Sequence, residues 1–272
     1  GEASIINIQT KAVKSQIVII SNISETALSD VANYSELETR LAKLNDQSQN
    51  SLTMSSQVIS TEKSLVAGDN YLGYTSMGTE NINGISQPLE ITRLVARLDL
   101  VDAKTKFTKE FLRNRSVKIE EVRILNQNTA SHYFSREYWG AVMATGNLSS
   151  SEPTTLNRVI SNDTGFDDTP YIHYVMENDA TEAPTTLQVK ATLSATDIYP
   201  AQTRIFTAVI NKNGLESHYN HNFIKRNYVY KLHISLHCYI CTIPQQKKRS
   251  VCTNRFSYMI IKNLLIQLLF PR

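Results

Sequence analysis

The side chains that could do chemistry are few and scattered along the chain. The 272 residues include six histidines, at His132, His173, His218, His221, His233 and His237. None of them shows the HExxH spacing of a zinc hydrolase, and none has an acid placed nearby in the sequence to orient it. His218 and His221 lie in a polar segment, where solvated side chains are expected. His233 is expected on the polar surface of a strand.

The cysteines offer one possible metal motif. Cys238 and Cys241 form a single CxxC pair, and Cys252 follows later in the chain. Zinc would need a fourth ligand, which His233 or His237 could supply in principle. Because a CxxC without a second pair has low specificity, we predict no metal site here.

Enzyme motifs are also missing from the sequence. It contains no GxSxG, no Walker sequence and no glycine-rich phosphate loop, and it has only 9 glycines to build such turns. Asp167 and Asp168 are adjacent carboxylates, but they stand in the polar run DDTP and are interpreted as turn formers. We therefore expect no catalytic residue, no cofactor and no metal, and a protein that is not an enzyme.

Charge divides the chain into a body and a tail. From Cys238 onward there are six basic residues and no acid, which leaves 22 basic and 25 acidic residues in 1–237. A mildly acidic body does not predict a nucleic-acid partner. The sequence has no stretch of about 20 apolar residues, so it does not predict a membrane span. The segment 256–270 comes nearest, but it is shorter and contains Lys262.

The rest of the sequence shows the patterns of secondary structure that would form the scaffold, and these are almost entirely those of β-strands. QIVIISN at 16–22 predicts a strand buried on both faces. After it, Ser35 is expected to cap one helix in which Leu37, Leu41 and Leu44 share a face. Short segments rich in Val, Ile, Tyr and Thr then alternate with turn residues, at 65–76, 88–102, 117–127, 171–179, 185–195 and 203–214. The polar stretch 144–170 is expected to be a long surface loop.

Two strands carry more specific information. In PLEITRLVARLDL, Leu89 and Ile91 occupy odd positions whereas Leu94 and Leu98 occupy even ones, so the strand is expected to leave one sheet and enter another. The closing strand alternates without error from 228 to 236. Its apolar side is Tyr228, Tyr230, Leu232, Ile234 and Leu236, and its predicted outward side is Lys231, His233 and Ser235.

Taken in order, these segments resemble the FimA-type major fimbrillins, the type V pilins of Bacteroidales. QIVIISN is similar to a buried family strand, and LVAGDNYLGYTSMG followed by PLEITRLVARLDL to the family's most recognisable pair of segments. The residues that carry this part are Tyr71, Tyr74, Arg93, Ala96 and Arg97. VKIEEVRILNQ, YVMEND, TTLQV and FIKRNYVYKLHISL then follow in family order, the last with Arg226, Asn227 and Tyr230 in an RN..Y pattern. The resemblance covers residues 12 to 236.

The resemblance implies an all-β fold with one short helix, built as two tandem transthyretin-like Greek-key β-sandwiches. The expected divisions are an N-terminal domain at 1–88, whose first strand is either reduced to a remnant or missing, a C-terminal domain at 89–237 and an atypical tail at 238–272. The chain starts at Gly1 without a leader pattern, so a secretion signal is expected to have been removed or not included. The IINIQ run at 5–9 is a possible remnant of the missing strand.

The resemblance also implies a function. Family members are exported as lipoprotein precursors at the outer membrane and trimmed by a protease that cleaves after arginine. They then polymerise head-to-tail as a fimbrium on the cell surface, because a strand of one subunit fills a groove of the next. The expected partners are therefore other fimbrial subunits, with a host or bacterial surface receptor for adhesion. The alternative is a tip or accessory adhesin that binds a host protein or glycan through loops such as 144–170.

The tail departs from the family pattern, which places a donor strand, often with Trp, after the closing strand. The only Trp of this chain is Trp139. The tail is consistent with three hypotheses: a divergent donor strand at 256–270, an accessory or tip subunit that needs no donor, or an out-of-frame translation beyond about 237. Reading the coding DNA in all frames downstream of Leu236 tests the third.

Overall fold

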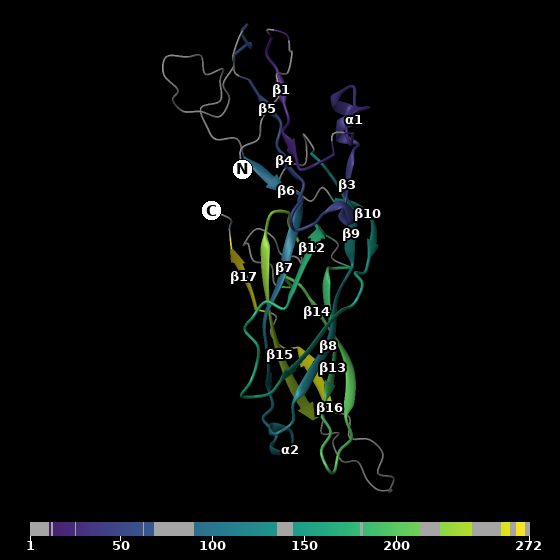
Figure 1. Ribbon diagram of the computed structural model, residues 1–272, viewed down its shortest axis with the longest axis vertical. Coiled ribbons are helices and arrows are strands. Elements are labelled where there is room, and N and C mark those ends of the chain that lie inside the picture. Colours follow the sequence, from purple (N-terminus) through teal and green to yellow (C-terminus); the bar gives the residue numbers. More distant parts are fainter. Residues whose placement is uncertain are drawn as a thin grey trace, which may run out of the picture.

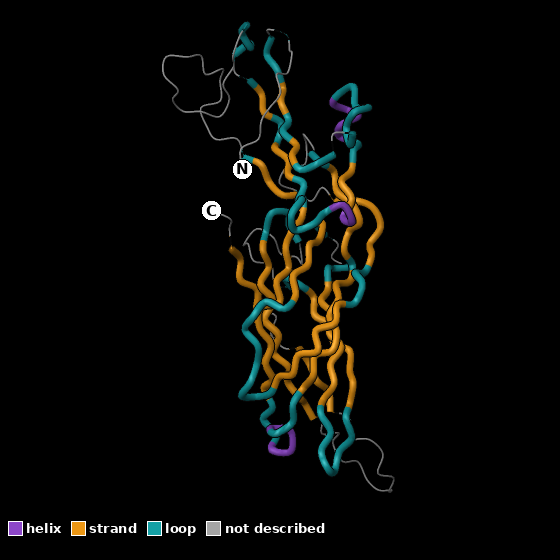
Figure 2. Tube along the Cα trace, viewed as in Figure 1, coloured by secondary structure: helices purple, strands orange, loops and turns teal. Residues whose placement is uncertain are grey.

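We describe a computed structural model of the chain, which forms an elongated molecule made almost entirely of strands (Figures 1 and 2). The structure describes residues 11, 13–24, 26–61, 63–67, 90–134, 144–179, 182–212, 224–240, 257–261 and 265–269. Short N-terminal strands occupy one end of the long axis, and a sandwich of longer strands fills the other (Figure 1). In the described part of the chain, no helix is long and apolar enough to span a membrane. The predicted all-β class with little helix is confirmed.

The C-terminal half is a sandwich of two sheets. One sheet has the order β11-β8-β13-β14, from β11 (Thr154–Ile160), β8 (Val117–Leu125), β13 (Thr186–Leu193) and β14 (Gln202–Val209). The other has the order β12-β7-β15-β16 with β17 also on β15, from β12 (Tyr171–Met176), β7 (Val95–Lys106), β15 (Val229–Ile240), β16 (Ser257–Ile261) and β17 (Leu265–Leu269). The helix α2 (Glu110–Arg113) joins β7 to β8 at the far end.

Alternating side chains from both sheets meet in one core. In β13 the predicted inward residues Leu187, Val189 and Ala191 are fully buried. Leu98 and Leu100 of β7 face the same core, as do Ile119 and Ile124 of β8. The closing strand β15 adds the inward residues Tyr230, Leu232, Ile234 and Leu236. A period of two with one face inward is sufficient to explain this burial.

The N-terminal end is built from much shorter strands. They are β1 (Gln16–Ile17), β2 (Ile20–Ser21), β3 (Leu41–Lys43), β4 (Met54–Ser56), β5 (Ile59–Ser60) and β6 (Ile91–Arg93). They form a β1-β5 pair and a β2-β4-β6 sheet. β3 instead pairs with β9 (Gln127–His132), which also pairs with β10 (Ala144–Ser149). The sheet that contains β3 is therefore completed by strands that follow β7 and β8 in the sequence.

Two points mark where the chain changes sheet. At Leu94 the strand leaves β6 in the N-terminal sheet and enters β7 in the sandwich, as the phase change in the sequence predicted. At Asn126, which has a positive φ of 56°, β8 ends and the chain passes into β9. Leu94, Val95 and Met176 are fully or almost fully buried in a second apolar cluster between the two halves. The division at 1–88, 89–237 and 238–272 remains a prediction.

The predicted helix with a Leu37, Leu41 and Leu44 face is wrong in extent. The helix α1 covers only Tyr34–Glu38, after which the chain forms β3 and the 3-10 helix η1 (Leu44–Asp46). Leu41 is 40 % exposed and pairs with β9, because a sheet partner is available at this point. Tertiary pairing has overridden the local helical pattern.

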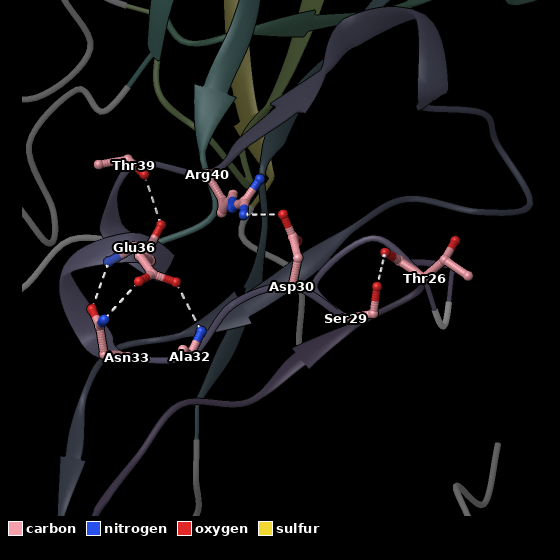
Figure 3. Close-up of polar contacts among 8 residues, drawn as sticks. All are labelled: Thr26, Ser29, Asp30, Ala32, Asn33, Glu36, Thr39 and Arg40. Carbon is pink, nitrogen blue, oxygen red and sulfur yellow. Dashed lines mark hydrogen bonds and ion pairs between the residues drawn. The ribbon is translucent and has the colours of Figure 1, made fainter.

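The N-cap of α1 is Asn33, and not Ser35 as predicted. Asn33 Oδ1 accepts a hydrogen bond from the Glu36 amide at 3.1 Å, and the Glu36 carboxylate accepts one from the Ala32 amide at 2.9 Å (Figure 3). The two bonds together form a reciprocal cap. Arg40, just after the helix, ion-pairs with Asp30 (Figure 3).

Two further expectations need correction. The stretch 16–22 is not one strand buried on both faces: it splits into β1 and β2, and the aliphatic residues from Ile17 to Ile20 are half-buried. The stretch 144–170 is not a long loop, because it contains β10 and β11. Most side chains of β11 are exposed, as on an edge strand, so its Thr and Asn residues lack the apolar alternation that would have revealed it. The predicted strand around Tyr71 and Tyr74 lies outside the described residues.

Candidate assembly site

The closing strand β15 is paired along both of its edges. On one side it runs parallel to β7, from Val229 opposite Arg97 to His237 opposite Lys106. On the other side two tail strands run antiparallel to it: β17 pairs with 229–233 and β16 with 236–240. The apolar tail therefore occupies, within its own chain, the strand position beside β15.

The two faces of β15 differ from the prediction on one point. Leu232, Ile234 and Leu236 are buried, as expected. The opposite face is not solvated, however, because Ser235 is also buried and its hydroxyl lies 3.1 Å from His237 Nε2. A strand with neighbours on both edges has less of either face in water than its alternation alone suggests.

His233 is accordingly not a free surface residue. Its side chain is 26 % exposed, and its Nδ1 lies 3.2 Å from Asp102 Oδ1 on the neighbouring β7. The expectation that none of the histidines has an orienting acid was therefore wrong for His233. The acid was missed because it lies 131 positions away in the sequence and is brought close only by the parallel pairing of β15 with β7.

The residues just before β15 fasten the two halves of the molecule together. Arg226 Nη2 lies 3.0 Å from Glu177 Oε2, and the side chains are only 10 % and 2 % exposed. The same nitrogen donates to Ser131 Oγ of β9 at 2.9 Å. Asn227, with φ of 63°, donates its amide to the Val95 carbonyl at 2.9 Å. The RN..Y pattern thus acts as a clamp at the point where the chain crosses between sheets.

A second polar network supports the crossing at Asn126. Asn178 Nδ2 donates to the Asn126 carbonyl at 2.9 Å and to Thr185 Oγ1 at 3.0 Å. Thr185 Oγ1 in turn donates to the same carbonyl at 3.0 Å. Because Asn178 and Thr185 are buried, these bonds satisfy groups that would otherwise be costly to bury. The segments YVMEND and TTLQV therefore contribute to the same junction as RN..Y.

The N-terminal end also exposes apolar side chains, as the outer faces of the sandwich do. Four large apolar residues are exposed here by 40 to 50 %: Val13, Leu41, Val66 and Ile91. Among the described strands, β1 has a single partner, β5. A strand edge that no other described strand covers, with aliphatic side chains exposed near it, is a surface on which an added strand can pair.

The other candidate residues do not come together as a reactive site. His132 Nδ1 lies 2.7 Å from the Glu38 carbonyl, and His173 Nε2 lies 2.7 Å from Gln127 Oε1. Asp167 is exposed, and Asp168 forms an exposed ion pair with Arg158. Within the residues that the structure describes, no group of three or more potential metal ligands occurs.

His218 and His221 lie outside the described residues, as do Cys241, Cys252 and Trp139. Cys238 belongs to β15, where its backbone stands opposite Met259. The CxxC motif thus stays a sequence observation.

One feature was missed by sequence reasoning although a signal was present. In β8 the buried residues are Val117 and Ile119, then Val122 and Ile124, so the inward phase changes between them. This is the same signal that located Leu94 in the 88–102 segment. Here it marks a bulge that places two consecutive glutamates on the outer face of the sandwich.

Comparisons with known proteins match this arrangement. Residues 94–241 match the family model of the C-terminal domain of Fim1C-like fimbrium tip subunits, and residues 1–93 match that of the FimA major fimbrial subunit protein. The two matches meet at Leu94, where the chain changes sheet. The first covers more than half of the chain and ends five residues beyond 236, where the family resemblance was predicted to end.

Individual relatives carry the same names. The chain is 47 % identical over 226 residues to a Parabacteroides distasonis protein provisionally named fimbrium tip subunit Fim1C, covering 83 % of this chain and 60 % of the relative. It is 26 % identical over 260 residues to the major fimbrium subunit FimA type-2 of Porphyromonas gingivalis, covering 82 % and 64 %. The chain therefore spans less than two thirds of the length of these curated relatives.

Solved structures agree on the fold. A cell adhesion protein of Parabacteroides distasonis superposes with a TM-score of 0.78 at 41 % identity, over 96 % of this chain and 76 % of that one. The fimbrilin FimA of Porphyromonas gingivalis gives a TM-score of 0.52 at 18 % identity, over 83 % and 72 % of the two chains, which is a likeness of fold. The chain therefore belongs to the FimA-type fimbrillins, with a Fim1C-like C-terminal domain.

Proposed function

We propose that this chain is a fimbrium subunit that accepts a strand from a neighbouring subunit at its N-terminal end and keeps its own C-terminal strands in place. The observation that carries the proposal is the pairing of β16 and β17 with β15 of the same chain. A subunit that accepts a strand but donates none can occupy only one end of a head-to-tail filament. We assign it to the tip, in agreement with the name of the 47 % identical relative.

The acceptor half of the proposal rests on β-augmentation. The short strands β1 and β2 carry half-buried aliphatic side chains, and Val13 and Ile91 expose 50 % and 41 % of their surface. A strand added here would form main-chain hydrogen bonds and cover this apolar surface. The proposal includes proteolytic trimming after an arginine as the step that opens the position, in a precursor anchored at the outer membrane as a lipoprotein.

The second candidate is a shaft subunit that polymerises with copies of itself. It is favoured by the match of residues 1–93 to the FimA model and by the apolar tail strands. In that case β16 and β17 must leave β15 and insert into the next subunit. The two candidates therefore differ in whether the tail moves.

A disulfide lock separates the two candidates. Lys231 of β15 stands opposite Gln267 of β17, so Lys231→Cys with Gln267→Cys, in a background with the native cysteines changed to serine, would hold the tail in place. The protein is mixed, without protease treatment, with a trimmed FimA-type shaft subunit and run on SDS gels without boiling. We expect an SDS-resistant heterodimer that forms equally well with the lock oxidised or reduced.

The contrary results are equally definite. A ladder formed by the chain alone, and abolished when the lock is oxidised, would replace the tip assignment by the shaft assignment. Absence of any SDS-resistant complex with the shaft subunit would overturn strand acceptance itself. The single mutant Lys231→Cys is the control for the substitution. If the coding DNA continues the family pattern in another frame after Leu236, the tail loses its place in this proposal.

We further propose a receptor on a host or bacterial surface as the partner of the exposed end, and no enzymatic role. Both remain predictions from the family.

A further inference from the structure

The outer face of the β11-β8-β13-β14 sheet carries a double irregularity at Glu120. On the β13 side, Lys190 stands opposite Glu121 and the next residue, Ala191, stands opposite Ile119. On the β11 side the register also shifts between the partners of Glu121 and Ile119. Glu120 is thus the extra residue against β13, whereas on the other edge two residues of β11, Leu156 and Asn157, stand against it. Bulges of this kind redirect side chains and occur often beside functional sites.

The bulge brings two carboxylates to one lysine. In a regular strand Glu120 and Glu121 would point to opposite faces, but here both lie 3.4 Å from Lys190 Nζ. Glu120 also accepts a hydrogen bond from Thr192 Oγ1 at 2.9 Å. Hydrogen bonds to Glu120 and to Glu121 raise the pKa of Lys190 above its ordinary value.

Beside this cluster the sheet surface is hollowed. The hollow has a volume of about 170 Å³ and is lined by Glu121, Val122, Arg123, Pro153, Gln188, Lys190 and Ile205. Arg123 Nε donates to Gln188 Oε1 at 2.6 Å, which fixes both side chains. Ile205 stands opposite Lys190 in the register. It lies on the solvent face of β14 and is 62 % exposed, although its side chain is apolar. The hollow therefore combines fixed polar groups with an exposed apolar wall.

The charges of the lining select a class of ligand. Arg123 and Lys190 balance Glu121 and the adjacent Glu120, so the hollow has no excess charge with which to attract an ion. It offers hydrogen-bond donors and acceptors side by side, with Ile205 and Pro153 as apolar contacts. Its volume is below the roughly 300 Å³ at which pockets for drug-sized molecules begin, so it suits one ring rather than a large molecule.

We propose that this hollow binds one neutral pyranose residue of a surface glycan. The hydroxyl groups of such a sugar donate to the Glu121 and Gln188 oxygens and accept from Arg123 and Lys190. Its C–H face contacts Ile205. A role of this site in adhesion rests on the proposed fimbrial function, but binding of the sugar does not depend on assembly of the fimbrium.

The test is a titration of the purified monomer, followed through its backbone amide resonances. The probes are the methyl glycosides of β-galactose, β-glucose, α-mannose and N-acetyl-β-glucosamine, with sialic acid as the anionic comparison. We expect at least one neutral glycoside to shift the amides of 121–123 and 187–190 saturably. Gln188→Ala should weaken its binding at least tenfold. Lys118→Ala, an exposed change on the same strand outside the hollow, should leave it unchanged.

Each other outcome overturns the proposal. No shift with any neutral glycoside, a Gln188→Ala variant that is folded and binds as tightly as the parent, or binding of sialic acid alone would do so. Since the assay uses the monomer, its failure leaves the strand-acceptor function intact. Conversely, failure of the SDS-gel assay leaves the sugar site intact.

Discussion

The faces of the strands are buried to different degrees at the two ends of this molecule. In the C-terminal sandwich, β7 and β15 each have 12 residues and their inward side chains are sealed in one core. At the N-terminal end, β1 and β2 each have two residues, and the neighbouring aliphatic side chains are half-buried. The sequences of the two regions are similarly apolar, so composition does not explain the contrast.

The difference lies in the strand partners. β15 has β7 on one edge and the tail strands on the other, whereas β1 has β5 alone among the described strands. Burial in a sheet protein depends on neighbours as much as on alternation, because a missing strand exposes both main-chain groups and the side chains it would cover. In the proposed acceptor, a strand from a second subunit would remove the cost of that exposure. The following predictions test this contrast.

The largest effect is expected where the two regions are joined. Arg226→Ala leaves Glu177 buried without its cation, so we expect the free energy of unfolding to fall by about 4 kcal/mol. Arg158→Ala is the matched control, because its ion pair with Asp168 has side chains 45 % and 53 % exposed and should matter by less than about 1 kcal/mol. Urea unfolding measures both. Equal losses would show that the clamp does not couple the regions.

The next test makes a similar truncation in each region. Leu232→Ala removes a fully buried side chain of β15 and should cost about 3 kcal/mol. Ile19→Ala, in the half-buried N-terminal stretch, should cost about 1 kcal/mol. If the Ile19 variant proves as unstable as the Leu232 variant in urea unfolding, the N-terminal end is better sealed than its exposed residues indicate.

The sandwich should also be sensitive to acid through His173. Burial lowers the pKa of His173 to about 4, so this histidine stays neutral in the folded state while the unfolded chain takes up a proton near pH 6.5. The unfolded state then binds more protons, and stability falls as the pH drops from about 6.5 toward 4. Between pH 7 and pH 5 we expect a loss of about 2 kcal/mol from this group.

The variant His173→Gln isolates that contribution. Glutamine can still hydrogen-bond with Gln127 but has no proton to gain. Urea unfolding at the two pH values should show a loss that is smaller by about 2 kcal/mol in the variant than in the parent. An unchanged pH dependence would mean that other groups cause the acid sensitivity.

The smallest effect concerns the short helix at the N-terminal end. Asn33→Ala removes the bond to the Glu36 amide and should cost about 1 kcal/mol. Ser35→Ala, at the residue that the sequence favoured as the cap, should change stability by less than about 0.5 kcal/mol. Hydrogen exchange at the amides of 36–38 reports the difference directly. A larger effect at Ser35 would contradict the observed cap.

The sequence predicted the features that depend on neighbouring residues but missed those that depend on residues far away in the chain. Period-two alternation identified the inward faces of β13 and β15, and a phase change located the switch at Leu94, because each residue's face follows from its immediate neighbours. The helix around Leu37 failed because β9, from residue 127 onward, offers Leu41 a strand partner. The edge strands β10 and β11 were missed because exposed edges need no apolar pattern.

The sequence by itself therefore determined the all-β class, the inward residues of the main strands and the family. Only the tertiary structure decided which strand covers which edge: that the tail lies on β15, that β9 pairs with β3 at the N-terminal end, and that Glu120 and Glu121 share one lysine. The physical reason is that pairing between strands uses main-chain groups, which are the same in nearly every residue. Side-chain type thus specifies which face of a strand is buried, whereas the complete fold decides which strand it pairs with.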